Sequence, residues 1–166
     1  MDEDTRTASL VIGGTGMLAA ATRWLAPRSR VTILVARRAS GFQIGGARLR
    51  PVDADWSQGS FPDQVTAALA EAGPIGTALL WLHEPEPVLA WLLQRLRGAR
   101  IVLVSGSMDG RPGLPGAAEA LATVRLGSVA GAHGRRWLTH AEISAGAIVA
   151  LQDGVSRVVG ELTPLP

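Results

Sequence analysis

The chain has 166 residues, of which 47% are apolar and 18% charged, and its formal net charge is +2. This composition is typical of a globular domain and excludes a disordered or membrane-spanning chain. No long basic run is present, which argues against a nucleic-acid partner, and the lack of cysteine excludes disulfides and zinc–thiolate sites. We expect one domain over residues 1–166.

The first residues, Met1 to Thr5, lack the basic and apolar segments of a signal peptide, so a cytoplasmic location is expected. All 16 basic residues are arginine. The sequence pI of about 10.8 therefore reflects the absence of lysine and tyrosine as much as true basicity.

The first predicted strand, Ala8 to Ile12, ends at a glycine cluster and is followed by a predicted helix from Met17 to Ala26. The spacing Gly13-x-x-Gly16-x-x-Ala19 is typical of a turn that binds a dinucleotide. Gly13 allows a sharp turn, Gly16 allows the backbone to approach a pyrophosphate, and Ala19 lets the helix pack closely on the strand.

We expect the whole turn to bind the cofactor. Its residues are Gly13, Gly14, Thr15, Gly16, Met17 and Leu18. The alternative is an ordinary glycine-rich turn between a strand and a helix. The repeated strand and helix patterns further along the chain favour the nucleotide interpretation.

The second predicted strand, Arg30 to Ala36, is followed by Arg37 and Arg38 with no acidic residue nearby. In dinucleotide-binding folds an acidic residue at this place binds the ribose of NAD, whereas arginine accommodates the 2′-phosphate of NADP. The pattern therefore favours NADP(H) over NAD(H). The alternative is that both are solvated loop residues. For Arg38 this alternative has the same weight as phosphate binding, and for Arg37 it has less.

A third strand is predicted from Leu49 to Val52, and Asp53 follows it. This carboxylate is placed to accept a hydrogen bond from an adenine amino group, although an aspartate after a strand is often a turn or cap residue. Ser60 and Pro62 then begin a helix whose apolar face is expected to lie on the sheet.

The fourth predicted strand, Gly76 to Leu82, leads into His83, and a helix is predicted from Glu86 to Arg97. A fifth strand, Arg100 to Val104, precedes Ser105 and Ser107. Alternating strands and helices with short links predict an α/β fold with a doubly wound parallel sheet between two layers of helices.

The remaining elements carry weaker signals. In chain order we expect a mobile loop from Gly106 to Gly116, a short helix from Ala117 to Thr123, a strand from Val124 to Val129, a helix ending near Asp153 and a strand from Val155 to Leu162. Thr139 and Glu142 have the spacing of a capping box at the start of the last helix.

These residues resemble the nucleotide-binding half of the short-chain dehydrogenase/reductase superfamily, and in particular its small, atypical members. The resemblance rests on the stretch Ile12 to Ala19, the arginine after the second strand, Val52-Asp53, and Arg136 to Thr139 before the last helix. It implies a Rossmann fold with Gly13, Gly16, Arg37 and Asp53 on a dinucleotide. It covers roughly Ala8 to Ser107.

The chain departs from this superfamily in its chemistry. The usual Tyr-x-x-x-Lys pair, in which the phenol transfers the substrate proton, is impossible here because the sequence contains neither residue. The superfamily's catalytic serine corresponds to the region of Ser105 to Ser107.

His83 is the best remaining proton donor or acceptor, since its unperturbed pKa is about 6.5. A role in binding the cofactor ribose or capping the next helix is at least as good an interpretation. Ser107 is a candidate to polarise a carbonyl, although such a serine more often bonds its own turn. Trp81 and Ser105 are expected near the cofactor, while His133 and His140 lack the spacing of metal ligands.

Two functions follow from the sequence. One is an NADP(H)-dependent oxidoreductase with non-standard proton chemistry and an unidentified small-molecule substrate. The other is a non-catalytic NADP(H)-binding redox sensor or partner subunit. The apolar helix from Glu86 to Arg97 further suggests a homodimer.

Overall fold

The computed structural model describes residues 6–82, 88–106 and 121–162. Its main feature is a parallel sheet of seven strands in the order β3-β2-β1-β4-β5-β6-β9. In chain order these are β1 (Ala8–Ile12), β2 (Thr32–Ala36), β3 (Leu49–Asp53), β4 (Ile75–Trp81), β5 (Arg100–Gly106), β6 (Leu121–Leu126) and β9 (Arg157–Val159). The predicted doubly wound parallel sheet is confirmed.

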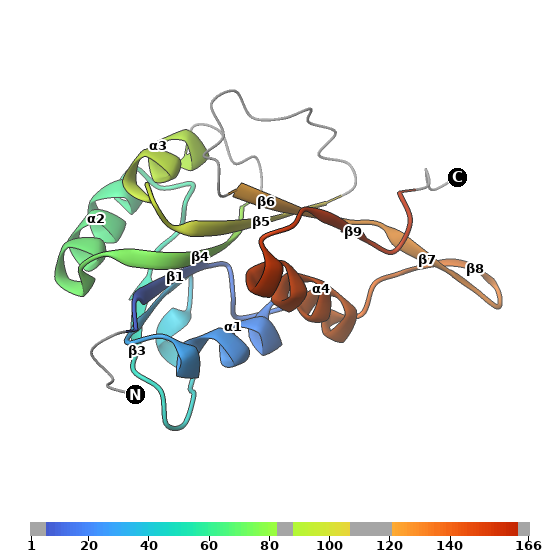
Figure 1. The fold of residues 1–166 in the computed structure, drawn as a ribbon, viewed down its shortest axis with the longest axis horizontal. Helices are drawn as coiled ribbons and strands as arrows, with labels where there is room; N and C mark the ends of the chain where they lie inside the picture. The colour runs from blue at the N-terminus through green and yellow to red at the C-terminus, as the bar shows by residue number, and fades with distance from the viewer. Residues whose placement is uncertain (1–5, 83–87, 107–120, 163–166) are drawn as a thin grey trace.

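In the described part of the chain, four α-helices cover the two faces of the sheet (Figure 1). They are α1 (Ala19–Leu25), α2 (Phe61–Ala72), α3 (Val88–Arg95) and α4 (His140–Asp153), with short 3-10 turns η2 (Ala26–Arg28) and η3 (Ala39–Gly41). One apolar core packs under α1 and α4, and a second packs under α2 and α3. The three-layer α/β/α arrangement is therefore confirmed as well.

The buried, β-branched sequences of the inner strands explain the centre of the sheet. All five residues of β1 are buried, and β1 pairs in parallel with both β2 and β4. The chain order of the strands reverses between β1 and β4, because β2 and β3 lie on one side of β1 and β4 to β9 on the other. Ligands of open α/β sheets bind at the carboxyl ends of the strands at such a switch point.

The second half of the chain differs from the sequence prediction. Residues 121–123, expected at the end of a helix, begin strand β6, and the predicted strand from Val124 to Val129 is divided between β6 and β7 (Ser128–Gly131). β7 forms an antiparallel hairpin with β8 (Gly134–Trp137), which the sequence analysis missed. The terminal strand is shorter than predicted and is confined to Arg157–Val159.

This hairpin projects from the body of the molecule between β6 and α4 (Figure 1). Its two-residue turn, Ala132-His133, lies between the paired glycines Gly131 and Gly134, and Gly134 has a φ of +113°. His133 and His140 are both exposed. Among the described residues, no helix combines the length and apolar character needed to cross a bilayer.

Candidate dinucleotide-binding site

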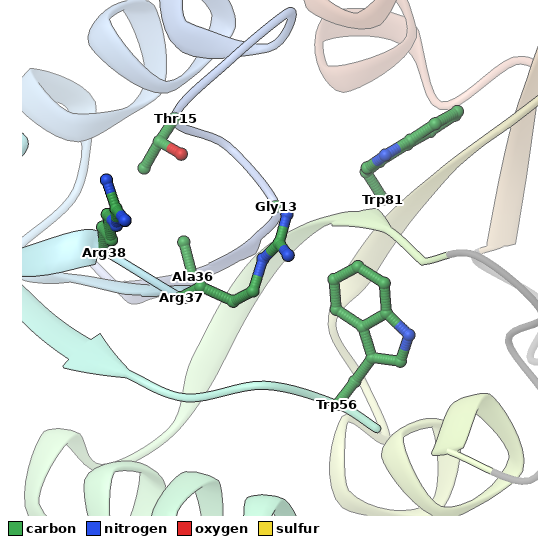
Figure 2. Close-up of a pocket in the computed structure, with 7 residues that line it drawn as sticks. All are labelled: Gly13, Thr15, Ala36, Arg37, Arg38, Trp56 and Trp81. Carbon is green, nitrogen blue, oxygen red and sulfur yellow. The ribbon is translucent and has the colours of Figure 1, made fainter. Parts of the chain in front are cut away.

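A cavity of about 550 Å³ opens at the carboxyl ends of β1 to β4. The described residues that line it are Gly13, Thr15, Ala36, Arg37, Arg38, Trp56 and Trp81 (Figure 2). Its volume lies within the range of small-molecule and cofactor sites. The cavity thus occupies the place at the switch point where the fold favours a ligand.

The turn after β1 is held tightly against the sheet. Gly13 has a φ of +76°, and a Cβ at this position would lie 2.7 Å from the carbonyl oxygen of Trp81. A Cβ on Gly14 would overlap the side chains of Val11 and Thr22, and the Thr22 hydroxyl donates to the Gly14 carbonyl over 2.8 Å. The helix therefore packs closely on the strand at Gly14.

The residues that follow differ from one another in exposure. Gly16 is exposed, with no atom within 4 Å of the place where its Cβ would be, so a ligand has access to its backbone. Leu18 is fully buried in the core under α1, backbone included, so it presents no accessible surface to a cofactor. Gly14, Gly16, Met17 and Leu18 are absent from the described cavity lining.

A side chain from the far end of the chain forms a hydrogen bond with the first turn of helix α1. Leu18 precedes α1 without a side-chain cap, and the buried hydroxyl of Ser144 on α4 accepts from the Ala21 N–H over 3.3 Å. The same hydroxyl donates to the Met17 carbonyl over 2.9 Å. Ser144 therefore fixes the end of the glycine turn, a role that the sequence analysis missed.

Arg37 and Arg38 follow β2 directly, and both are exposed. In the view of Figure 2 the guanidinium of Arg37 projects towards the two tryptophan rings, whereas Arg38 lies on the side of Thr15. Guanidinium groups bind phosphate oxygens in pairs of hydrogen bonds. The cavity therefore carries two cations suited to a phosphorylated ligand.

Asp53, at the end of β3, is bonded to the chain itself. Its carboxylate accepts from the backbone N–H of Ser40 over 2.8 Å and from the Ser40 hydroxyl over 2.7 Å. These bonds, the backbone one first, hold the pKa of Asp53 below its usual value. Asp53 does not belong to the described lining, and its bonds to Ser40 are those of a turn residue.

Trp56 lines the cavity although the sequence analysis did not assign it to the site. The sequence did contain a signal for this residue, because Trp56 lies three residues after Asp53, the last residue of β3. Trp81, at the end of β4, lines the cavity as expected.

The structure does not describe the two predicted catalytic residues. His83 and Ser107 fall outside the described residues. Ser105 is half-buried near the end of β5, and it is not part of the described lining. The described part of the site thus supplies binding groups: a glycine turn, a threonine hydroxyl, two guanidiniums and two indoles.

No protein-family model matches the sequence, and no curated protein is similar to it. Solved structures are similar in fold. A short-chain dehydrogenase from Burkholderia cenocepacia in complex with NADP aligns with a TM-score of 0.62 and 18% identity over 98% of this chain and 91% of that chain. This chain therefore has a Rossmann fold.

Two further Rossmann structures have similar scores. A dehydrogenase/reductase from Sinorhizobium meliloti aligns with a TM-score of 0.60 and 15% identity over 93% of each chain. An NADH-dependent reductase complexed with NAD aligns with a TM-score of 0.61 and 12% identity over the whole of both chains. At these identities the similarity concerns the fold alone.

Proposed function

We propose that this chain binds a nicotinamide dinucleotide in the cavity at the switch point and prefers NADP(H) to NAD(H). One observation carries the proposal. Arg37 and Arg38 follow β2 and line the same cavity as Gly13 and Thr15 of the turn after β1. This arrangement supports recognition of a 2′-phosphate by the arginines and of a pyrophosphate by the turn.

The residues present fit such a cofactor. The exposed, open surroundings of Gly16 leave room for a pyrophosphate against the backbone, and the described lining contains no carboxylate that would repel a phosphate. The similar structures support the assignment, since one contains NADP and another NAD. A bound dinucleotide would supply a hydride donor or acceptor at the edge of the sheet.

We further propose an oxidoreductase in which the fold positions cofactor and substrate for hydride transfer. His83 or water then handles the proton, since the chain has no tyrosine or lysine for this task, and Ser107 is the candidate to polarise a substrate carbonyl. The substrate class stays open.

The missing Tyr-x-x-x-Lys pair favours a second candidate function. A chain that retains a cofactor cavity but lacks the usual proton donor is suited to act as a non-catalytic redox sensor or as the partner subunit of another protein. Both functions use the same cavity, and they differ in whether NADPH is consumed.

Titration of the chain with NADPH and NADH, followed by tryptophan fluorescence or calorimetry, tests the shared cofactor assignment. We expect tighter binding of NADPH, because Arg37 adds a charged hydrogen bond to the 2′-phosphate, worth about 1.5–3 kcal/mol. Arg37→Ala should reduce the preference roughly ten- to a hundredfold and leave NADH affinity nearly unchanged. Equal affinity of the wild type for both cofactors would refute the assignment of Arg37.

Turnover separates the two candidate functions. An oxidoreductase should consume NADPH with some member of a panel of carbonyl, quinone and flavin acceptors, and His83→Ala should slow that reaction. Tight binding of NADPH without reduction of any acceptor would favour the sensor or partner subunit.

A further inference from the structure

The two tryptophans of the cavity are anchored in different cores. Trp56 packs against the core under α2 and α3, whereas Trp81 packs against the core under α1 and α4. Both are half-buried. Each indole therefore has a fixed contact with the body of the protein and also borders the cavity, which lies between the two layers.

The backbone that carries Trp56 is fixed by a closed turn. The carboxylate of Asp55 accepts from the Ser57 N–H over 2.9 Å and from the Ser57 hydroxyl over 2.7 Å. The Gln58 N–H donates to the Asp55 carbonyl over 3.0 Å. Since the ring and its backbone are both held before any ligand arrives, little conformational entropy is lost when a ligand packs against the indole.

Trp56 follows β3, and this position places it beside the part of the cavity that Arg37 and Arg38 line. β3 pairs directly with β2, which is followed by Arg37, whereas β4 is separated from β2 by β1. Arg37 also acts on Asp55, the residue before Trp56. The hydrogen bonds from Ser57 are the main cause of the lowered pKa of Asp55, and the positive charge of Arg37 lowers it further. Figure 2 shows the Arg37 guanidinium extended in the direction of the Trp56 ring.

These positions constrain the ligand. In a 2′-phosphorylated adenosine the base and the phosphate are attached to the same sugar, so a phosphate bound by the arginines after β2 keeps the base within a few ångströms of them. Trp56 lies three residues after β3, the strand adjacent to β2, and Trp81 ends β4, which lies one strand further from β2. Trp81 is also packed against the turn after β1, its Cδ1 3.1 Å from the Cβ position of Gly13.

We propose that Trp56 is the surface on which the adenine ring of the bound dinucleotide stacks. This inference rests on the proposed function and adds to it: the arginines after β2 recognise the 2′-phosphate, and Trp56 recognises the base that NADP(H) and NAD(H) share. Stacking of a base on an aromatic side chain changes affinity by roughly five- to a hundredfold when the side chain is truncated.

The test compares wild type, Trp56→Leu and Trp56→Phe by calorimetric titration with NADPH, NADH and adenosine 2′,5′-bisphosphate. Trp56→Leu should weaken all three ligands by a similar factor of about ten or more, because each carries adenine. Trp56→Phe should stay within about threefold of wild type, because it retains an aromatic face. Arg37→Ala should weaken only NADPH and the bisphosphate.

Trp137→Leu is the matched control. This tryptophan on β8 is 65% exposed and lies outside the described lining of the cavity, so its loss should leave all three affinities unchanged. Thermal melting followed by circular dichroism checks that each variant is folded, and where Trp56→Leu does not fold, Trp56→Gln replaces it with the same expected loss of affinity.

The outcomes are distinct. If wild type binds no dinucleotide, the proposed function fails and the stacking role fails with it. If wild type binds NADPH and folded Trp56→Leu binds it equally well, only the stacking role is overturned. A loss seen with NADPH but not with adenosine 2′,5′-bisphosphate would overturn it too, since Trp56 would then contact the other half of the cofactor.

Discussion

Gly14 and Gly16 lie two residues apart in the turn after β1, yet their surroundings differ. A Cβ on Gly14 would overlap Val11 and Thr22, so we expect Gly14→Ala to lower the free energy of unfolding by about 1–3 kcal/mol. Gly16 has open space around it, and Gly16→Ala should leave stability nearly unchanged while weakening NADPH binding.

Chemical denaturation of both variants, together with NADPH titration of Gly16→Ala, measures this difference. Equal stability losses in the two variants would contradict the packing role of Gly14. Unchanged NADPH affinity in Gly16→Ala would contradict the approach of a pyrophosphate to this part of the turn.

At the scale of single residues, the sequence predicted the site groups that belong to local patterns. Four such residues lie at or just after strand ends, within patterns of a few consecutive residues, and the structure brings them to one cavity: Gly13, Thr15, Arg37 and Trp81. Ser144 could not be predicted in this way, because its contact with α1 joins residues more than a hundred positions apart and has no local signature.

At the scale of elements, the start of α4 joins the projecting hairpin to the body. The predicted capping box is confirmed: Thr139 accepts from the Glu142 N–H over 3.1 Å, and Glu142 accepts from the Thr139 N–H over 2.8 Å. Glu142 also accepts two hydrogen bonds from Arg136 of β8. One carboxylate therefore stabilises the first turn of α4 and holds the hairpin against it.

These contacts give Glu142 a pH-dependent role. The bonds from Arg136, and then that from Thr139, lower its pKa from 4.5 to about 2. A carboxylate whose pKa is lowered on folding stabilises the protein above its unfolded pKa, and this contribution is lost as the pH falls from about 4.5 towards 2. Thermal melting of wild type should show a loss over this window that is smaller in Glu142→Gln. Parallel pH profiles for the two proteins would contradict the assignment.

The elements that the sequence predicted poorly are those without a strong periodic pattern. β7 consists of small residues with little apolar alternation, and its pairing with β8 depends on a turn whose glycines are not adjacent in sequence. Residues 121–123 follow a run rich in alanine that favours a helix, but pairing with β5 makes them the start of β6. Tertiary contacts therefore override local preference in this half of the chain.

At the scale of the whole molecule, the proposed cofactor should stabilise the native state. A ligand at a hundred times its Kd adds about 2.7 kcal/mol to the free energy of unfolding, which corresponds to a rise in Tm of about 5–10 °C for a domain of this size. We expect this rise with saturating NADPH and a smaller one with NADH at the same concentration. A Tm that neither cofactor changes would contradict binding of either dinucleotide.

The doubly wound parallel sheet could be predicted from alternation alone, since short links between buried strands and amphipathic helices leave few topologies for a parallel sheet. The first half of the chain, from β1 to β4, holds every described residue that lines the cavity. The second half was less predictable, yet its helix α4 packs on α1 and completes the core beneath it.

The hydrogen bonds of Ser144 bear on how the site is assembled during translation. The glycine turn emerges from the ribosome long before residue 144, and until then the Ala21 N–H and the Met17 carbonyl lack the partner that joins them in the finished protein. A nascent first half can therefore pair its strands without a settled turn. We expect competence to bind the proposed cofactor only after the last helix has docked, because Ser144 of that helix bonds the end of the glycine turn.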